Sequence, residues 1–289
     1  MTPLFDNLRK EEADTYSLVL ASAGIGSRVV KTDAGFRIDV PESLVDAAMN
    51  TITSFLKENP PVVEQKQQTH NGTTSRNLSG VAVALVLLCI HLAVMTSSAP
   101  SDYIDTFGAN ARWILSGEWY RCATALVLHA DDAHIAGNMV GAALFGGAVC
   151  AATGTGVGWL AILVCGICGN LINAWAHETG HLSIGASTAI FGAVGILCGL
   201  QATAALVSGK SWKKVAMALG AGIAFLAFLG ASERSDLGAH LFGFLCGLPL
   251  GVICQLRREN MPGIKGQMLC GAIAVFILVA AWLQGLAAG

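Results

Sequence analysis

Residues 184–207 read IGASTAIFGAVGILCGLQATAALV, a stretch without a single Asp, Glu, Lys or Arg. About 20 consecutive apolar residues are enough for a helix to cross the hydrocarbon core of a bilayer. The glycines at Gly195 and Gly199, four residues apart, are typical of helices that pack closely inside a membrane. A membrane-spanning helix is therefore predicted over 187–207.

The same apolar character recurs along the last three quarters of the chain. The 289 residues are 54% hydrophobic and 12% charged, whereas an average soluble domain carries about 25% charged residues. An ordinary soluble globule and a disordered chain are therefore excluded, and a net charge of −2 leaves no basic surface for nucleic acid. Seven membrane-spanning helices are predicted, over 78–96, 134–153, 156–175, 187–207, 213–230, 236–255 and 267–286.

The charged residues gather in the N-terminal quarter. Residues 1–76 contain 8 Lys or Arg and 10 Asp or Glu, half of all the charged residues in the chain. We predict that residues 1–58 form a small soluble α+β module and that 59–77, a polar stretch with Pro, Gly and Thr, form a linker. The expected elements of the module are a helix over 9–24, a hairpin with strands 27–32 and 36–40, and a helix over 42–57.

The placement of Lys and Arg predicts the orientation in the membrane. With residues 1–77 in the cytoplasm, seven cations flank the spans on the cytoplasmic side and three lie in loops on the opposite side. This bias favours a cytoplasmic N-terminus. Residues 1–20 lack the long apolar core of a cleavable signal peptide, so the first span is the expected insertion signal. A multi-pass protein of a bacterial plasma membrane is predicted.

A few polar side chains inside the predicted spans carry the functional argument. No Asp, Glu, Lys or Arg lies deep in a span, whereas ion-coupled transporters and proton pumps usually need an intramembrane ionisable pair. The second, fourth and sixth spans run in the same direction, and each has polar residues in its first turns. At 1.5 Å per residue along a helix, these polar residues lie within roughly 10 Å of the outer end of the membrane's hydrocarbon core. They are His134, Asn138, Ser187 and His240.

The chemistry of these four residues suits acyl transfer. Ser187 follows Gly185 and Ala186 at a helix N-terminus, where unpaired backbone N–H groups can bind a developing anion. A histidine at the same depth can accept the serine proton. His134 and Asn138 are spaced i, i+4 and project from one helix face, so they are candidate donors to the oxyanion of a tetrahedral intermediate.

Close packing of the fourth and sixth spans is also predicted. The sixth span carries glycines four residues apart at Gly243, Gly247 and Gly251, and the fourth span carries the glycine pair noted above. Such small-residue stripes let helix backbones approach one another closely. A short hydrogen bond between Ser187 and His240 requires that approach.

Several short segments on successive spans form a set with a consistent order. They are Trp119-Tyr120-Arg121, Leu128-His129, AHIAGN at 133–138, Gly169-Asn170, IGASTAIFG at 184–192 and GAHLFG at 238–243. In their order and in their assignment to successive spans, these segments resemble the rhomboid family of intramembrane serine proteases. The resemblance covers about residues 78–255.

The resemblance implies a fold and an activity. The fold would be a six-helix membrane bundle over 78–255 with an extra C-terminal helix within 256–289, so the expected class is an all-α polytopic membrane protein. The activity would be that of a serine endopeptidase that hydrolyses peptide bonds in or next to transmembrane segments of membrane proteins. The partners would be those substrates and the lipid bilayer, and no cofactor is implied.

The resemblance also implies roles for particular residues. The loop over 97–133 would be partly embedded in the membrane, and the fifth span would be the mobile gate for substrate. A serine–histidine dyad without an aspartate would carry out the reaction, and the backbone N–H of the serine would contribute to the oxyanion hole. The residues are Ser187 as nucleophile, His240 as general base, His134 and Asn138 as oxyanion donors, and Gly185, Phe191 and Gly243 as support for the site.

Two positions depart from the family pattern. The family motif is usually Gly-x-Ser-Gly, and here Thr188 stands in place of the glycine after the serine. Cys150 stands at the end of the second span, where many members carry a glutamate. Neither change removes a catalytic group, so an active protease is predicted. A catalytically inactive rhomboid-like scaffold is the alternative.

Another motif points to a different chemistry. Residues 177–181 read HETGH, the His-Glu-x-x-His pattern of zinc metalloproteases. That pattern needs a helix to bring both imidazoles to one face, but Gly180 interrupts it and it falls in a predicted outer loop. A zinc-dependent membrane protease using His177, Glu178 and His181 is therefore the less favoured alternative, and no metal site is predicted.

Overall fold

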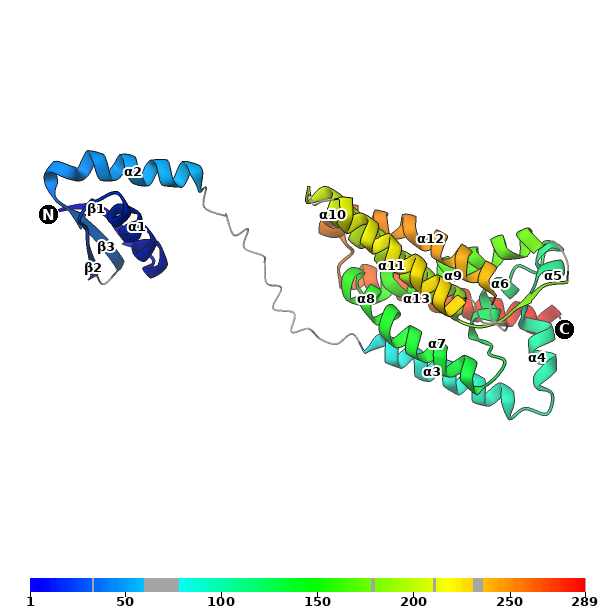
Figure 1. The fold of residues 1–289 in the computed structure, drawn as a ribbon. Helices are drawn as coiled ribbons and strands as arrows, with labels where there is room; N and C mark the ends of the chain where they lie inside the picture. Colours follow the sequence, from blue (N-terminus) through cyan, green and yellow to red (C-terminus); the bar gives the residue numbers. More distant parts are fainter. Residues whose placement is uncertain (33, 60–77, 178–179, 210–211, 231–235, 289) are drawn as a thin grey trace. The chain divides into compact units, whose positions relative to one another are not determined.

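The computed structural model describes residues 1–32, 34–59, 78–177, 180–209, 212–230 and 236–288 (Figure 1). The chain divides into two compact units, Met1–Thr73 and Thr74–Gly289. Of the predicted linker over 59–77, residues 60–77 lie outside the described residues. Each unit is described by itself.

The first unit is a small α+β fold. An antiparallel sheet has the strand order β1-β3-β2, and a core that includes Leu20, Ile38 and Ile52 is fully buried. The hairpin β2–β3 lies where alternation predicted it, but β1 was not predicted because its pairing with β3 is irregular in register. The elements are β1 (Thr2–Leu8), α1 (Lys10–Ser22), β2 (Arg28–Thr32), β3 (Gly35–Val40), η1 (Glu42–Leu44) and α2 (Val45–Glu58).

The second unit is a bundle of apolar helices (Figure 1). Its longer elements are α3 (Ser79–Met95), α7 (Asp132–Gly141) continued by η3 (Ala142–Gly146) and α8 (Gly147–Thr153), α9 (Thr155–His177), α10 (Ser187–Val207), α11 (Trp212–Gly230), α12 (Leu237–Leu256) and α13 (Ile264–Ala288). Its shorter elements are α4 (Pro100–Phe107), β4 (Ala109–Asn110), α5 (Ala111–Leu115), α6 (Arg121–Thr124), η2 (Ala125–Val127), β5 (Leu182–Ser183) and η4 (Arg258–Asn260).

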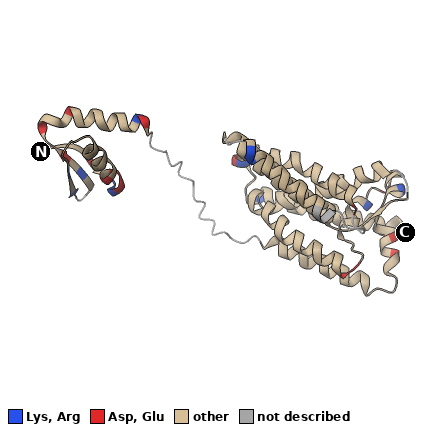
Figure 2. Cartoon of the chain, viewed as in Figure 1, with Lys and Arg blue, Asp and Glu red and all other residues tan. Residues whose placement is uncertain are grey.

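Several of these helices are long and apolar enough to cross a membrane. Among the described residues there are five, or up to six if α3 and α4, bent by 119° at their junction, count as one span. Figure 2 shows long stretches of the bundle without Lys, Arg, Asp or Glu. The chain is therefore a multi-pass integral membrane protein. The five are α7–α8, α9, α10, α12 and α13, whereas α3 and α11 coincide with the other two predicted spans.

Helix α10 is the centre of the bundle. In its most apolar window 67% of the residues are buried, compared with 17% for α13. It packs against α9, α11 and α12, and α12 is its most extensive neighbour. The helix that begins at Ser187 is therefore held on several sides by the rest of the unit.

Glycines bring α10 and α12 close together, as their spacing predicted. A Cβ atom added at Gly243 would meet the carbonyl oxygen of Thr188, and one at Gly247 would meet that of Gly192. On the other helix, a Cβ at Gly195 would meet the carbonyl oxygen of Phe244. The backbones therefore touch directly, and there is no room for a side chain between them.

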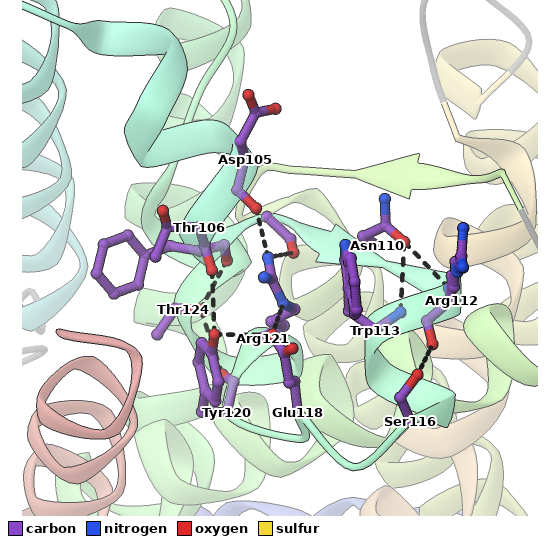
Figure 3. A network of polar contacts seen from close by, with 12 residues as sticks. Asp105, Thr106, Asn110, Arg112, Trp113, Ser116, Glu118, Tyr120, Arg121 and Thr124 are labelled. Carbon is purple, nitrogen blue, oxygen red and sulfur yellow. Dashed lines mark hydrogen bonds and ion pairs between the residues drawn. The ribbon is translucent and has the colours of Figure 1, made fainter. Parts of the chain in front are cut away.

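The connection between α3 and α7 is held by a buried arginine. The Arg121 guanidinium donates to Glu118 Oε2 at 2.7 Å and to the carbonyl oxygens of Asp105 and Gly108 at 2.6 and 3.3 Å. Figure 3 shows this network, in which the Arg121 side chain joins the end of α4 to the turn before α6. Because hydrogen bonds to charged groups are stronger than neutral ones, the connection has a defined shape.

The contact between α10 and α12 predicts a large effect of one added methyl group. Gly247→Ala should lower the midpoint of thermal unfolding in detergent, because the new Cβ must push α12 away from the Gly192 carbonyl. Gly220→Ala in α11 is the matched control, since its Cβ would meet nothing within 4 Å, and alanine favours a helix by roughly 1 kcal/mol over glycine. Equal midpoints for the two variants would contradict this packing.

Candidate active site

The turn before α10 has a conformation that requires glycine. Gly185 has a φ of +120°, a region that residues with a Cβ rarely adopt. Its N–H donates to the carbonyl oxygen of Ala125 in η2 at 2.9 Å, so the turn is tied to the connection that Arg121 holds. A Cβ at Gly185 would also lie 2.6 Å from His134 Nε2. Glycine is therefore needed twice, for the backbone and for the approach of the histidine ring.

Ser187 and His240 are in direct contact. Ser187 Oγ lies 2.8 Å from His240 Nε2, although the residues are on different helices. The ring of Phe191, one turn after the serine, stacks on the His240 ring with centroids 4.4 Å apart and an interplanar angle of 25°. His240 Nδ1 is buried and has no hydrogen-bond partner among the described residues. The arrangement thus has a serine and an orienting aromatic ring, without a carboxylate bonded to the histidine.

The position of His240 follows from the packing of the helices. Gly243 lies one turn after His240 and faces the Thr188 carbonyl, so the close approach of α12 to α10 extends to the level where the two side chains meet. The Thr188 side chain is buried, and its methyl group fills the space beside Gly169, where a Cβ would lie 2.7 Å from it. The threonine that departs from the family pattern is therefore accommodated inside α10 by a glycine on α9.

His134 lies beside the same turn. The Cβ position of Gly185 is 2.6 Å from His134 Nε2 and 3.6 Å from Ser187 Oγ, so the histidine ring and the hydroxyl are on the same side of Gly185. His134 Nδ1 accepts a long hydrogen bond from Ala130 N–H at 3.5 Å. An accepting Nδ1 in a neutral ring leaves the proton on Nε2, and Nε2 is then a donor that faces the turn.

Asn138 is buried near His134 but is not shown in contact with the serine. Its Nδ2 donates to the His134 carbonyl oxygen within α7 at 3.0 Å. A side-chain amide carries two N–H donors, so one remains. The structure thus brings Ser187, His240 and His134 together and places Asn138 one turn farther along α7.

His129 supports the turn before Ser187 through its ring. Its Nε2 accepts the Ala186 N–H at 3.4 Å, and its ring meets the His134 ring edge-on at 5.2 Å between centroids. Burial, with smaller effects from His134 and His91, lowers the pKa of His129 to about 3. The ring is therefore neutral at physiological pH, as an acceptor of a backbone N–H must be.

The HETGH motif is arranged differently from a zinc site. Residues 178–179 lie outside the described residues, and α9 ends at His177. The rings of His177 and His181 stack face to face, 4.1 Å apart with an interplanar angle of 13°. A metal binds in the plane of an imidazole, and two nearly parallel planes do not share a nearby point. Within the described parts of the chain, no group of three His, Cys, Asp or Glu is placed to hold a metal.

Comparisons with known proteins agree with this geometry. The model of the Rhomboid domain family matches residues 116–257, a range that contains Ser187, His240 and His134. Two proteins of Bacillus subtilis (strain 168) are similar. The putative rhomboid protease YdcA is 28% identical over 156 residues, 54% of this chain and 77% of YdcA. The rhomboid protease GluP is 27% identical over 204 residues, 68% of this chain and 38% of GluP.

The matched range also has a structural meaning. It runs from the turn before α6 to the end of α12, and it therefore includes the central helix, its glycine-lined contact with α12 and the Ser187–His240 pair. The domain match, the two relatives and the multi-pass helical fold agree, and residues 116–257 of this membrane protein are a Rhomboid domain.

Proposed function

We propose that this protein is an intramembrane serine endopeptidase in which Ser187 is the nucleophile and His240 the general base. The observation that carries the proposal is the 2.8 Å contact between Ser187 Oγ and His240 Nε2. Both residues lie at the N-terminal ends of apolar helices. The bond to be cleaved therefore lies in or next to a transmembrane segment of a membrane protein, near one surface of the bilayer.

The reaction follows from the placement of these atoms. Ser187 Oγ attacks the substrate carbonyl carbon while His240 Nε2 takes the hydroxyl proton, which gives a tetrahedral intermediate. The C–N bond then breaks, and His240 returns the proton to the leaving amine. A water molecule attacks the resulting ester with His240 again as base. Serine is released, and the new carboxyl end of the substrate leaves.

The negative oxygen of the intermediate needs donors. The backbone N–H of Ser187 is at a helix N-terminus, where such groups are unpaired and the helix dipole favours negative charge. His134 Nε2 faces the same turn, and the second amide hydrogen of Asn138 is a third donor. Donors that are fixed before the reaction stabilise the charge without reorganisation, and each is worth roughly 10²–10³ in kcat.

The wider architecture belongs to the same proposal. The rhomboid core would consist of six spans over 78–255, with α13 as a seventh span. Contacts between α13 and the rest of the bundle support its inclusion, for example the Trp282 ring stacked 4.1 Å from the Phe107 ring. The distribution of Lys and Arg favours a cytoplasmic N-terminal module and supports assignment to a bacterial plasma membrane.

Substrate would enter from the lipid by displacement of α11. This helix packs mainly on α10, and its Phe225 ring lies 5.6 Å from Phe191 and 4.9 Å from Phe145. Phe191 in turn stacks on the proposed base. Movement of α11 would therefore separate aromatic rings that contact one another and open a path to the site.

Removal of either member of the pair tests the mechanism. Ser187→Ala and His240→Ala should each abolish cleavage of a model transmembrane substrate by the purified protein, measured on gels, because the nucleophile or its base is gone. Ser208→Ala, which removes an exposed hydroxyl at the other end of α10, should cleave at the wild-type rate. Full activity of the Ser187→Ala protein would refute the proposal.

Loss of an oxyanion donor should change kcat and KM differently from loss of a residue that binds substrate. His134→Ala and Asn138→Ala should lower kcat by roughly 10²–10³ if each supplies a donor. KM should change little, because the bond strengthens only in the transition state. The kinetic constants on the same substrate measure this. A variant that raises KM at unchanged kcat has lost ground-state binding, and its residue is then not an oxyanion donor.

A chelator distinguishes the serine mechanism from the zinc alternative. Cleavage by the purified protein should be unchanged after incubation with 1,10-phenanthroline, because no step proposed above involves a metal. The same gel assay measures the rate before and after the incubation. Loss of activity that added Zn²⁺ restores would instead favour chemistry at the HETGH motif.

A further inference from the structure

The HETGH motif has no part in the mechanism above, but both of its histidines are near the end of the bundle where Ser187 and His240 meet. His177 ends α9, and its Nδ1 lies 3.0 Å from the Asn173 carbonyl oxygen. Its ring stacks on that of His181. His181 Nε2 in turn lies 2.6 Å from Oδ2 of Asp236. The two histidines of the motif are therefore connected, through His181, to the carboxylate of Asp236.

The Asp236 carboxylate joins three segments of the chain. Its Oδ2 accepts Asn173 Nδ2 of α9 at 2.7 Å as well as His181 Nε2. Its Oδ1 accepts the Ala239 N–H at 3.0 Å and so caps α12. The side chains of His181 and Asp236 are only 28% and 16% exposed. Each carboxylate oxygen thus has a partner in a partly buried environment, where a hydrogen bond is stronger than in water.

Both reacting residues are a few positions away from this carboxylate. His181 precedes Ser187 by six residues and is followed directly by β5, which pairs with β4. The His181 carbonyl oxygen accepts the Ala111 N–H at 2.9 Å. Asp236 precedes His240 by four residues, and its carbonyl oxygen accepts the His240 N–H at 3.1 Å. The hydrogen bond between His181 and Asp236 therefore links the segment that enters the serine turn to the first turn of the helix that carries His240.

The carboxylate is ionised in this environment. Burial by itself raises the pKa of Asp236, but interactions with the Ala239 N–H, the His181 side chain and the Ser183 side chain outweigh it, so the pKa lies below its ordinary value. A hydrogen bond to an ionised acceptor is shorter and about twice as strong as a neutral one. The link is thus stronger than an ordinary side-chain contact on a loop.

We propose that Asp236 is a positioning residue for the reaction, and that it acts through His181 and Asn173 to keep the serine turn and the first turn of α12 in register. The proposal rests on the function proposed above. It assigns the HETGH histidines a structural partner in place of a metal. A misplacement of about 1 Å between reacting groups can cost roughly 10²-fold in rate, so loss of the link should reduce turnover and leave substrate binding largely intact.

Variants at both ends of the link test the proposal. The readouts are kcat and KM on a model transmembrane substrate and the rate at which a fluorophosphonate labels Ser187. His181→Ala and Asp236→Ala should each lower kcat and the labelling rate by roughly 10–100-fold, with KM within a few-fold of wild type. The double variant should be no worse than the more impaired single one, because both changes break one interaction.

Conservative replacements separate positioning from general loss of structure. His181→Gln places an amide donor near the position of Nε2 and should restore most of the rate that His181→Ala loses. Asp102→Ala, which removes an exposed carboxylate from the connection between α3 and α7, should match wild type. If Asp236→Ala does not fold, Asp236→Asn replaces it. The amide oxygen of the asparagine can still accept the Ala239 N–H, but its NH₂ group cannot accept from His181 or Asn173. A loss of rate like that of His181→Ala is therefore expected.

The two proposals fail in different ways. Wild-type kcat in folded His181→Ala or in the Asp236 variant would overturn the positioning role, and so would equal impairment of His181→Gln and His181→Ala or additive losses in the double variant. In each of these cases the wild-type protein still becomes labelled at Ser187. Cleavage of substrate by the Ser187→Ala protein, or a wild-type protein that is never labelled at Ser187, would instead refute the proposed function.

Discussion

The direct contact between the backbones of α10 and α12 is the constraint on which the rest of the structure depends. Inside a bilayer, lipid is as apolar as the side chains, so helices associate through close packing. Gly243 and Gly247 allow the carbonyl oxygens of Thr188 and Gly192 to lie where a side chain would otherwise be. This approach places Ser187 and His240 within hydrogen-bond distance. The contact between Ser187 and His240 thus depends on the absence of side chains at glycines elsewhere on the same two helices.

The turn before Ser187 and the connection between α3 and α7 carry the polar contacts around Ser187 and His240. Gly185 is tied to Ala125 by its N–H, and Ala186 is tied to His129, so the turn before the serine is held by backbone hydrogen bonds to the first connection. Arg121 fixes that connection through buried carbonyl groups. The site therefore depends on several segments far apart in sequence. Each supplies a donor or an acceptor that would be costly to leave unpaired.

Patterns within one segment of the sequence predicted the features that depend on that segment alone. Twenty apolar residues form a span because of bilayer thickness, and glycines at every fourth position share a helix face because of helical periodicity. Strand β1 was missed because its register with β3 is irregular. The HETGH pattern was ambiguous for a similar reason. Whether two imidazoles point at one metal or stack at 4.1 Å depends on where α9 ends and on a carboxylate 55 residues later.

The sequence by itself determined the membrane class, the positions of the apolar helices, and the choice of Ser187, His240, His134 and Asn138 as residues at one level. These follow from composition and from distance along single helices. The resemblance implied a supporting role for Phe191, whereas the tertiary structure alone decided that the Asn138 amide bonds within its own helix. It also decided that Asp236 holds His181. The physical reason is that a hydrogen bond requires atoms within about 3 Å, and positions along one chain do not specify distances between different helices.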